Sequence, residues 1–441
     1  MIPRNMRNRL LSDEPVQSSK QSRMINRPDK QNVTLHLVLV QSSQSKAGLL
    51  SSGIAMQTDE LLVDRIGCVT VLTLNRPRQL NVLSLSMVRK LQEVYARSDA
   101  DPEIKAIVVR GAGERPCLCA GGDVKRIYEM RTHSKTDSFF ADALSFFAAE
   151  YVMNSFLGRL TTPHVALMDG IVMGGGCGVS VNGSHRCATE RTVLSMPECA
   201  IGLVPDVGGT HFLSKVQGEL GTMLALTGRR LSGLDAKVLG LATHTLASDD
   251  VPRVVNELAT ALADVNKSEA AGVVGNVLSR LETQLQAVPS DVAPRRAAID
   301  GWFAGDSLED IVAALTDATK GNEGDLAKEL LEAIQAGSPT SLKVTLAMLR
   351  RASSDPSLVS CLQTELCAVA GCLARADFYE GVRALLVDKG KGPKPAWRVG
   401  RLEEVSAEDV EAHLAPETEE VEVIVARFRE EANSGDSTAR L

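Results

Sequence analysis

The 441-residue sequence lacks three features, each of which would point to a particular class of protein. No apolar run approaches the roughly 20 residues that cross a bilayer, so we expect no membrane span. The nine cysteines include no CxxC pair, which argues against a small disulfide-stapled fold and predicts no bound metal. Basic charge is not in excess, because the formal net charge is −7, and we predict no direct nucleic-acid binding.

The first segment, residues 1–57, differs in composition from the rest of the chain. It is rich in arginine, serine and glutamine and poor in acidic residues. This composition is typical of an organelle transit peptide, so we predict an N-terminal extension that directs the protein to mitochondria. Two alternatives are an extension without regular structure and a start of translation at Met24 or Met56.

Hydrophobic residues make up 44% of the chain, enough for a sizeable core, and residues 58–250 alternate between strand and helix patterns. Apolar, β-branched runs between residues 61 and 74 predict a hairpin, and helical spacing follows over 85–95. A buried strand is expected at 105–110. The same order returns further along the chain, with a glycine turn, a helix and short strands at 165–168, 187–189 and 193–195. Strands that alternate with helices predict an α/β core.

Beyond about Ala247 only helical patterns remain. We divide this part into a helical segment at 251–335, C-terminal helices at 336–405 and an acidic tail at 406–441. The last of these is dense in glutamate. A solvated helix or tail explains that density, and a dedicated binding surface is the alternative.

Two glycine-rich segments stand where predicted strands end. Gly121-Gly122 precedes a predicted helix, and Gly174–Gly178 holds the same place in the second unit. Backbone N–H groups at such turns are well placed to stabilise an anion. One N–H from each turn, directed at a single carbonyl oxygen, would form an oxyanion hole. Close packing of strand against helix also selects glycine, whereas a phosphate-binding P-loop is excluded because no Gly-Lys-Ser/Thr ending follows.

Two carboxylates flank a short apolar stretch further along the chain. Glu198 follows Pro197, and Asp206 follows Pro205. Either could be an acid of a catalytic site. Either could equally be an ordinary residue at a helix start, where carboxylates are common.

The combination of these motifs carries more information than any one of them. Leu74–Pro77, Ala120–Asp123, Met173–Gly176 and Met196–Glu198 follow one another in the order and spacing of the crotonase superfamily. Over about residues 61–406 the sequence resembles most closely the 3-hydroxyisobutyryl-CoA hydrolase family. The resemblance implies an α/β fold, a crotonase-like spiral of repeated ββα units followed by C-terminal helices that complete the fold.

The resemblance also implies roles for individual residues. Gly122 and Gly175 match the amides that polarise a thioester carbonyl, and Glu198 and Asp206 match two catalytic acids. Glu150, Gly175, Glu198 and Asp206 match positions that bind substrate. Glu198 would act as a general base on water or attack the acyl group directly, two routes that stay open.

Arg76 and Arg78 lie where related proteins contact the nucleotide part of CoA, although the family often has lysine at the second position. A contact with phosphate and a solvated surface arginine are the two interpretations of each. Gly178 marks a departure from the wider superfamily, because enoyl-CoA hydratases have a second glutamate there. A hydratase needs both carboxylates, so the glycine favours thioester hydrolysis over hydration or isomerisation.

The resemblance thus implies hydrolysis of a short 3-hydroxyacyl-CoA, with 3-hydroxyisobutyryl-CoA of valine catabolism as the expected substrate. It implies no cofactor beyond the CoA of the substrate, a location in the mitochondrial matrix and a homo-oligomer. A different class is also kept open. Proteins of this kind serve as structural subunits of the small subunit of mitochondrial ribosomes, and the unmatched termini would then be docking arms.

Overall fold

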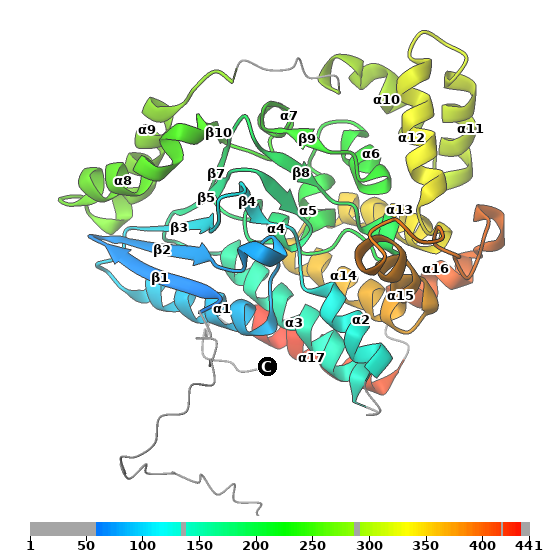
Figure 1. Cartoon of the computed structure of the whole chain (residues 1–441), viewed down its shortest axis with the longest axis horizontal. Helices are drawn as coiled ribbons and strands as arrows, with labels where there is room; N and C mark the ends of the chain where they lie inside the picture. The colour runs from blue at the N-terminus through cyan, green and yellow to red at the C-terminus, as the bar shows by residue number, and fades with distance from the viewer. Residues whose placement is uncertain (1–58, 134–137, 286–291, 416–417, 434–441) are drawn as a thin grey trace, which may run out of the picture. The chain divides into compact units, whose positions relative to one another are not determined.

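The computed structural model describes residues 59–133, 138–285, 292–415 and 418–433 (Figure 1). The predicted N-terminal extension lies outside the described residues. All nine cysteines lie within them, and all are free and buried.

The fold begins with the expected hairpin. Strands β1 (Leu61–Ile66) and β2 (Val69–Leu74) pair antiparallel, with Leu61 opposite Leu74. Gly67 makes the turn at a φ of +59°, a conformation that glycine adopts without steric cost. Every residue of β2 is buried, because both faces of the sheet are covered.

The strands form two separate sheets. The larger has the order β1-β2-β3-β5-β7-β10, and all its pairs except β1 with β2 are parallel. Its further strands are β3 (Ala106–Gly111), β5 (His164–Met168), β7 (His185–Ala188) and β10 (His244–Thr245). The smaller has the order β4-β6-β8-β9, formed by β4 (Cys117–Cys119), β6 (Ile171–Met173), β8 (Val193–Ser195) and β9 (Leu231–Ser232). Since β3, β5 and β7 are each followed by a strand of the smaller sheet, the chain advances as the expected spiral.

Helices cover the sheets on both sides. The first four are α1 (Leu85–Ala100), α2 (Val124–His133), α3 (Phe139–Leu157) and α4 (Gly175–Gly178). The helix expected after the glycine run is misplaced in the prediction. The glycine run itself forms α4, and residues 179–184 form turns that lead to β7. The next helices are α5 (Gly209–Leu213), α6 (Leu220–Thr227), α7 (Gly233–Val238), α8 (Val254–Leu262) and α9 (Ala270–Leu281).

The larger sheet separates two hydrophobic clusters. Val69 and Val71 of β2 pack with apolar residues of α8 and α9, whereas Leu72 and Leu74 belong to the main core with α1 and α3. Figure 1 shows α8 and α9 beyond the strands on the side away from α1 and α3.

The C-terminal part is helical, as expected. It contains α10 (Arg296–Phe303), α11 (Leu308–Ala318), α12 (Gly324–Ala336), α13 (Pro339–Ser354), α14 (Leu358–Leu373) and α15 (Ala376–Val382). Helix α14 contacts α3, α13 and α15. Within the described residues no single helix is long and apolar enough to cross a membrane. A bent pair, α14 with residues 376–387, passes that test by length and composition, and α14 is largely buried inside the fold.

A solvated helix or a tail was expected at 406–441, and its described residues are helical but not wholly solvated. These residues form α16 (Ala407–Leu414) and α17 (Glu419–Asn433), and α17 runs along α3 and α14 (Figure 1). The physical reason is an apolar stripe at helical spacing, made of Val421, Val425, Phe428 and Ala432, which are all buried. The abundant glutamates hid this periodicity in the composition.

Candidate active site

The two glycine turns expected to form an oxyanion hole lie against each other. Gly122 follows β4, and Gly175 opens α4 after β6, the parallel neighbour of β4. A methyl group placed on Gly175 would lie 3.1 Å from the amide nitrogen of Gly122. Neither N–H donates to a protein acceptor in the described part of the chain. Two adjacent amides are therefore available to one oxygen of a ligand.

Packing around both glycines is also close. A methyl group on Gly175 would lie 2.5 Å from Oε1 of Glu150, and one on Gly122 would lie 3.2 Å from the ring of Phe146. The two interpretations of these glycines, close packing and an oxyanion site, are thus compatible at the same positions.

Glu150 projects from α3 toward these turns. Its side chain is buried, and its Oε1 atom has no hydrogen-bond partner. Burial, followed by the charge of Asp206, raises the pKa of this carboxyl well above its ordinary value. A neutral carboxylic acid beside the two amides can donate a hydrogen bond to a ligand.

Glu198 opens a short 3-10 helix, η2 (Glu198–Ile201), directly after β8. Its Oε1 atom lies 2.7 Å from where a methyl group on Gly174 would be, and its Oε2 atom has no hydrogen-bond partner. Burial and then the nearby Asp206 raise the pKa of Glu198 well above its ordinary value. The second glycine turn therefore lies close to this carboxyl and leaves no space for a side chain at Gly174.

Asp206 is the third buried acid of the site. The hydroxyl of Tyr151 donates a hydrogen bond of 2.6 Å to its Oδ2 atom. Burial raises the pKa of Asp206 to about 7, and the bond from Tyr151 works against that rise. Because nearby carboxylates cannot all ionise easily, we expect this group of acids to hold a proton near neutral pH.

Gly178 faces no open space. A methyl group there would lie 2.8 Å from Cβ of Val207 and 3.0 Å from Oδ1 of Asn154. A glutamate at this position would displace both neighbours. The structure therefore provides no room for the second acid that hydratases have at the matching position.

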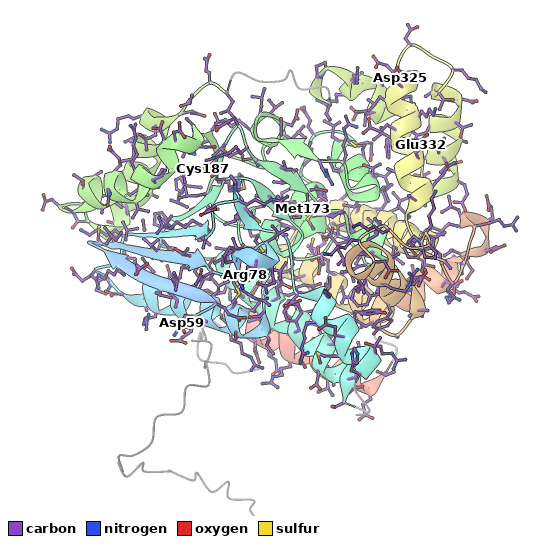
Figure 2. The ribbon with its side chains drawn as sticks, viewed as in Figure 1. Asp59, Arg78, Met173, Cys187, Asp325 and Glu332 are labelled. Carbon is purple, nitrogen blue, oxygen red and sulfur yellow. The ribbon has the colours of Figure 1, made fainter. Side chains whose placement is uncertain are left out.

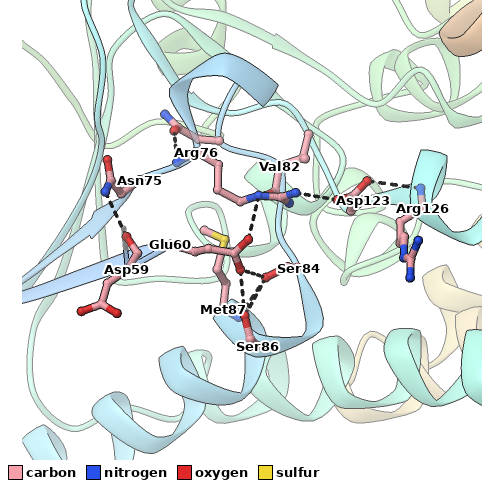
Figure 3. A network of polar contacts seen from close by, with 11 residues as sticks. Asp59, Glu60, Asn75, Arg76, Val82, Ser84, Ser86, Met87, Asp123 and Arg126 are labelled. Carbon is pink, nitrogen blue, oxygen red and sulfur yellow. Dashed lines mark hydrogen bonds and ion pairs between the residues drawn. The ribbon is translucent and has the colours of Figure 1, made fainter. Parts of the chain in front are cut away.

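Arg76 lies in a network of polar contacts within the protein. Its guanidinium donates to Asp123 at 2.9 Å and to the carbonyl of Val82 at 3.0 Å, and it pairs with Glu60 at 3.2 Å (Figure 3). Asp123 directly follows Gly122, so this network ties the first glycine turn to the hairpin. The interpretation as a solvated arginine does not fit these contacts, and the contact of Arg76 with the phosphate of CoA stays a prediction.

Arg78, labelled in Figure 2, lies in the short helix η1 (Pro77–Gln79) and is exposed. None of its contacts with described residues is a hydrogen bond or an ion pair. Its contact with the nucleotide of CoA stays a prediction.

The model of the family described as enoyl-CoA hydratase/isomerase matches residues 69–414. The chain belongs to this family. Its fold is that of the crotonase superfamily, as the resemblance implied.

Within the family the chain is similar to proteins with two kinds of name. The 3-hydroxyisobutyryl-CoA hydrolases, mitochondrial, of Bos taurus and Homo sapiens are 40% and 39% identical to it. The alignments cover 80% and 81% of this chain and 87% and 88% of those proteins. The crystal structure of a carnitinyl-CoA dehydratase from Mycobacterium thermoresistibile is 38% identical, with a TM-score of 0.71, covering 82% of this chain and 98% of that one.

Two residues of the site were not among those expected from the sequence. Tyr151 lies in α3, whose residues are buried on nearly every face, so no periodicity singles it out. Glu365 lies in α14 and contacts the turn that follows Asp206. A lone carboxylate inside the apolar run of α14 is a signal that could have identified it.

Proposed function

We propose that this protein hydrolyses the thioester of 3-hydroxyisobutyryl-CoA, which yields 3-hydroxyisobutyrate and CoA, as a step of valine catabolism. One observation carries most of the weight. The amides of Gly122 and Gly175 lie side by side, have no acceptor among the described residues, and are next to Glu198 and Glu150. The names of relatives about 40% identical to the chain support the acyl group.

In this mechanism the thioester carbonyl accepts hydrogen bonds from both amides. The oxyanion that forms on addition of a nucleophile is stabilised there, and each donor is worth on the order of 10² to 10³ in rate. In the direct route the oxygen of water forms a bond to the acyl carbon, the carbon–sulfur bond breaks, and the thiolate of CoA takes up a proton; in the covalent route Glu198 displaces the thiolate and water then hydrolyses the anhydride. The reaction is thus complete with water and the acids of the site, and we propose no metal or other cofactor.

Glu198 has two routes open to it. As a general base it accepts the proton of water, and as a nucleophile it forms a mixed anhydride that water then hydrolyses. A single turnover in ¹⁸O-labelled water tests the nucleophilic route. Label enters the Glu198 carboxyl when water attacks the glutamyl carbonyl of the anhydride, and the general-base route never places label there. In either route Asp206 positions the substrate hydroxyl or the water.

The deciding assay offers the purified protein 3-hydroxyisobutyryl-CoA and crotonyl-CoA separately. We expect thiol release from the first. Addition of water to crotonyl-CoA without any thiol release from the first would contradict hydrolysis and favour the hydratase alternative, which the names of some solved relatives suggest. Gly178, packed against Val207 and Asn154, argues against that alternative.

We further propose that the protein acts in the mitochondrial matrix as a homo-oligomer. The word mitochondrial in the names of its relatives supports the organelle. The same names favour an enzyme over a structural subunit of the mitochondrial ribosome. Fractionation of mitochondria tests the location, and co-sedimentation with ribosomes would support the ribosomal alternative.

A further inference from the structure

Glu365 is a fully buried carboxylate that contacts the turn between Asp206 and α5. It accepts hydrogen bonds from the N–H groups of Gly208 at 2.8 Å and Thr210 at 2.9 Å, and from the hydroxyl of Thr210 at 2.6 Å. All three donors lie within four residues of Asp206. A helix from the C-terminal part of the chain therefore holds the segment that carries this acid.

The segment that Glu365 contacts has strained backbone dihedral angles. Val207 has a φ of +55°, which is a rare conformation for a β-branched residue, and Gly208 follows at +86°. The side chain of Asn182 donates to the carbonyl of Val207 at 2.9 Å. Strained conformations of this kind persist only where the surrounding structure holds them.

Burial of Glu365 also calls for a reason. No cation pairs with it among the described residues, and a buried carboxylate without a cation is unfavourable compared with an apolar side chain. Its carboxylate accepts three hydrogen bonds, two from backbone N–H groups and one from the hydroxyl of Thr210. An apolar residue would fill the space and leave these donors without partners.

We propose that Glu365 is a positioning residue, which keeps the carboxylate of Asp206 in place for thioester hydrolysis by holding Gly208 and Thr210. The inference rests on the proposed function. Tyr151 holds the carboxylate of Asp206 itself, and Glu365 holds the backbone on its other side. Catalytic groups must be held to within about 0.5 Å, and a displacement of about 1 Å can lower a rate by about 10²-fold.

The test compares four variants of the full chain by thiol release from 3-hydroxyisobutyryl-CoA. Glu365→Gln keeps the length of the side chain but loses an acceptor, and we expect kcat to fall by about 10²-fold with KM changed less than about twofold. Thr210→Val, which removes only the hydroxyl bond, should lower kcat by about tenfold, whereas Thr210→Ser should restore it. Glu431→Gln, at a buried carboxylate on α17, is the matched control and should match the wild type.

The outcomes separate the two proposals. A wild-type protein that releases no thiol contradicts the proposed function. An active wild type with folded Glu365→Gln and Thr210→Val variants of unchanged kcat overturns the positioning role alone. So does a rise in KM without a fall in kcat, or a loss in Thr210→Ser equal to that in Thr210→Val. If Glu365→Gln does not fold, the Thr210 pair decides.

Discussion

Four buried carboxyl groups shape the chemistry at the scale of single residues: Glu150, Glu198, Asp206 and Glu365. Burial is the largest cause of a raised pKa in each of them. The neighbouring charge of Asp206 raises the pKa of the other three further. The site can therefore both hold and release protons near neutral pH.

The first prediction concerns Glu198. We expect Glu198→Gln to lower thiol release by about 10² to 10⁴, because an amide neither accepts the proton of water nor attacks the acyl carbon. Thiol release and thermal unfolding are measured together, and the melting temperature should stay near that of the wild type. Glu403→Gln, at an exposed position, is the control. Undiminished activity would refute the role of Glu198.

The second prediction concerns Tyr151. Its hydroxyl stabilises the ionised form of Asp206, so Tyr151→Phe should raise the pKa of Asp206 beyond its value of about 7. If the reaction needs ionised Asp206, the acid limb of the kcat/KM profile should move to higher pH. Steady-state kinetics from pH 5 to 9 measure it, and an unmoved limb would show that this bond does not govern the titration.

At the scale of elements, α3 and α17 connect the site to the C-terminal end of the fold. Helix α3 carries both Glu150 and Tyr151, and α17 packs against it with a stripe that includes Phe428. Figure 1 shows α17 lying along α3. Apart from the buried Glu431, the glutamates of α17 lie on its exposed side, whereas its apolar side covers the helix that bears the site.

The third prediction follows from this packing. Phe428 is fully buried, so Phe428→Ala should lower the free energy of unfolding by about 3 kcal/mol through lost burial and the cavity left behind. Denaturation in urea measures the change. Glu430→Ala, at an exposed position of the same helix, should change it by less than about 0.5 kcal/mol. Equal effects of the two variants would mean that α17 is not part of the cooperative fold.

At the scale of the whole molecule, the spiral brings together groups that are far apart in the sequence. The hydroxyl of Tyr151 reaches Asp206 across 55 positions, and Glu365 reaches Gly208 across 157. The segments after β4, β6 and β8 contribute Gly122, Gly175 and Glu198. The low polarity of the interior around them is a property of the folded chain alone.

The fourth prediction links this burial to stability. The pKa values of Asp206 and Glu365 are raised from 3.8 and 4.5 to about 7, so the folded protein retains protons that the unfolded chain loses at lower pH. The stabilisation that these protons give the folded protein is complete at a pH below the pKa values of the unfolded chain. It is lost as the pH rises through about 7, the pKa of these groups in the folded protein. Glu365→Gln removes one such group, so its free energy of unfolding should fall less than that of the wild type between pH 4 and 8. Urea denaturation across this range measures the slopes, and equal slopes would contradict the raised pKa.

The sequence by itself determined the alternation of strands and helices, the places of the glycine turns and the family. These depend on local periodicity and on short motifs, which can be recognised without knowledge of how the chain folds. The folded structure then placed Gly122, Gly175, Glu150, Glu198 and Asp206 around one site, while their catalytic roles stay predictions.

Only the tertiary structure decided what Arg76, Tyr151, Glu365 and the acidic C-terminal segment do. Arg76 donates to Asp123 beside a glycine turn, and the segment expected as a solvated helix or a tail contains α16 and α17, which have buried apolar sides. Each of these outcomes depends on which distant side chain comes within about 3 Å, the range of a hydrogen bond, or within packing contact. Composition and spacing carry no information on such distances, because the path of the chain through space sets them.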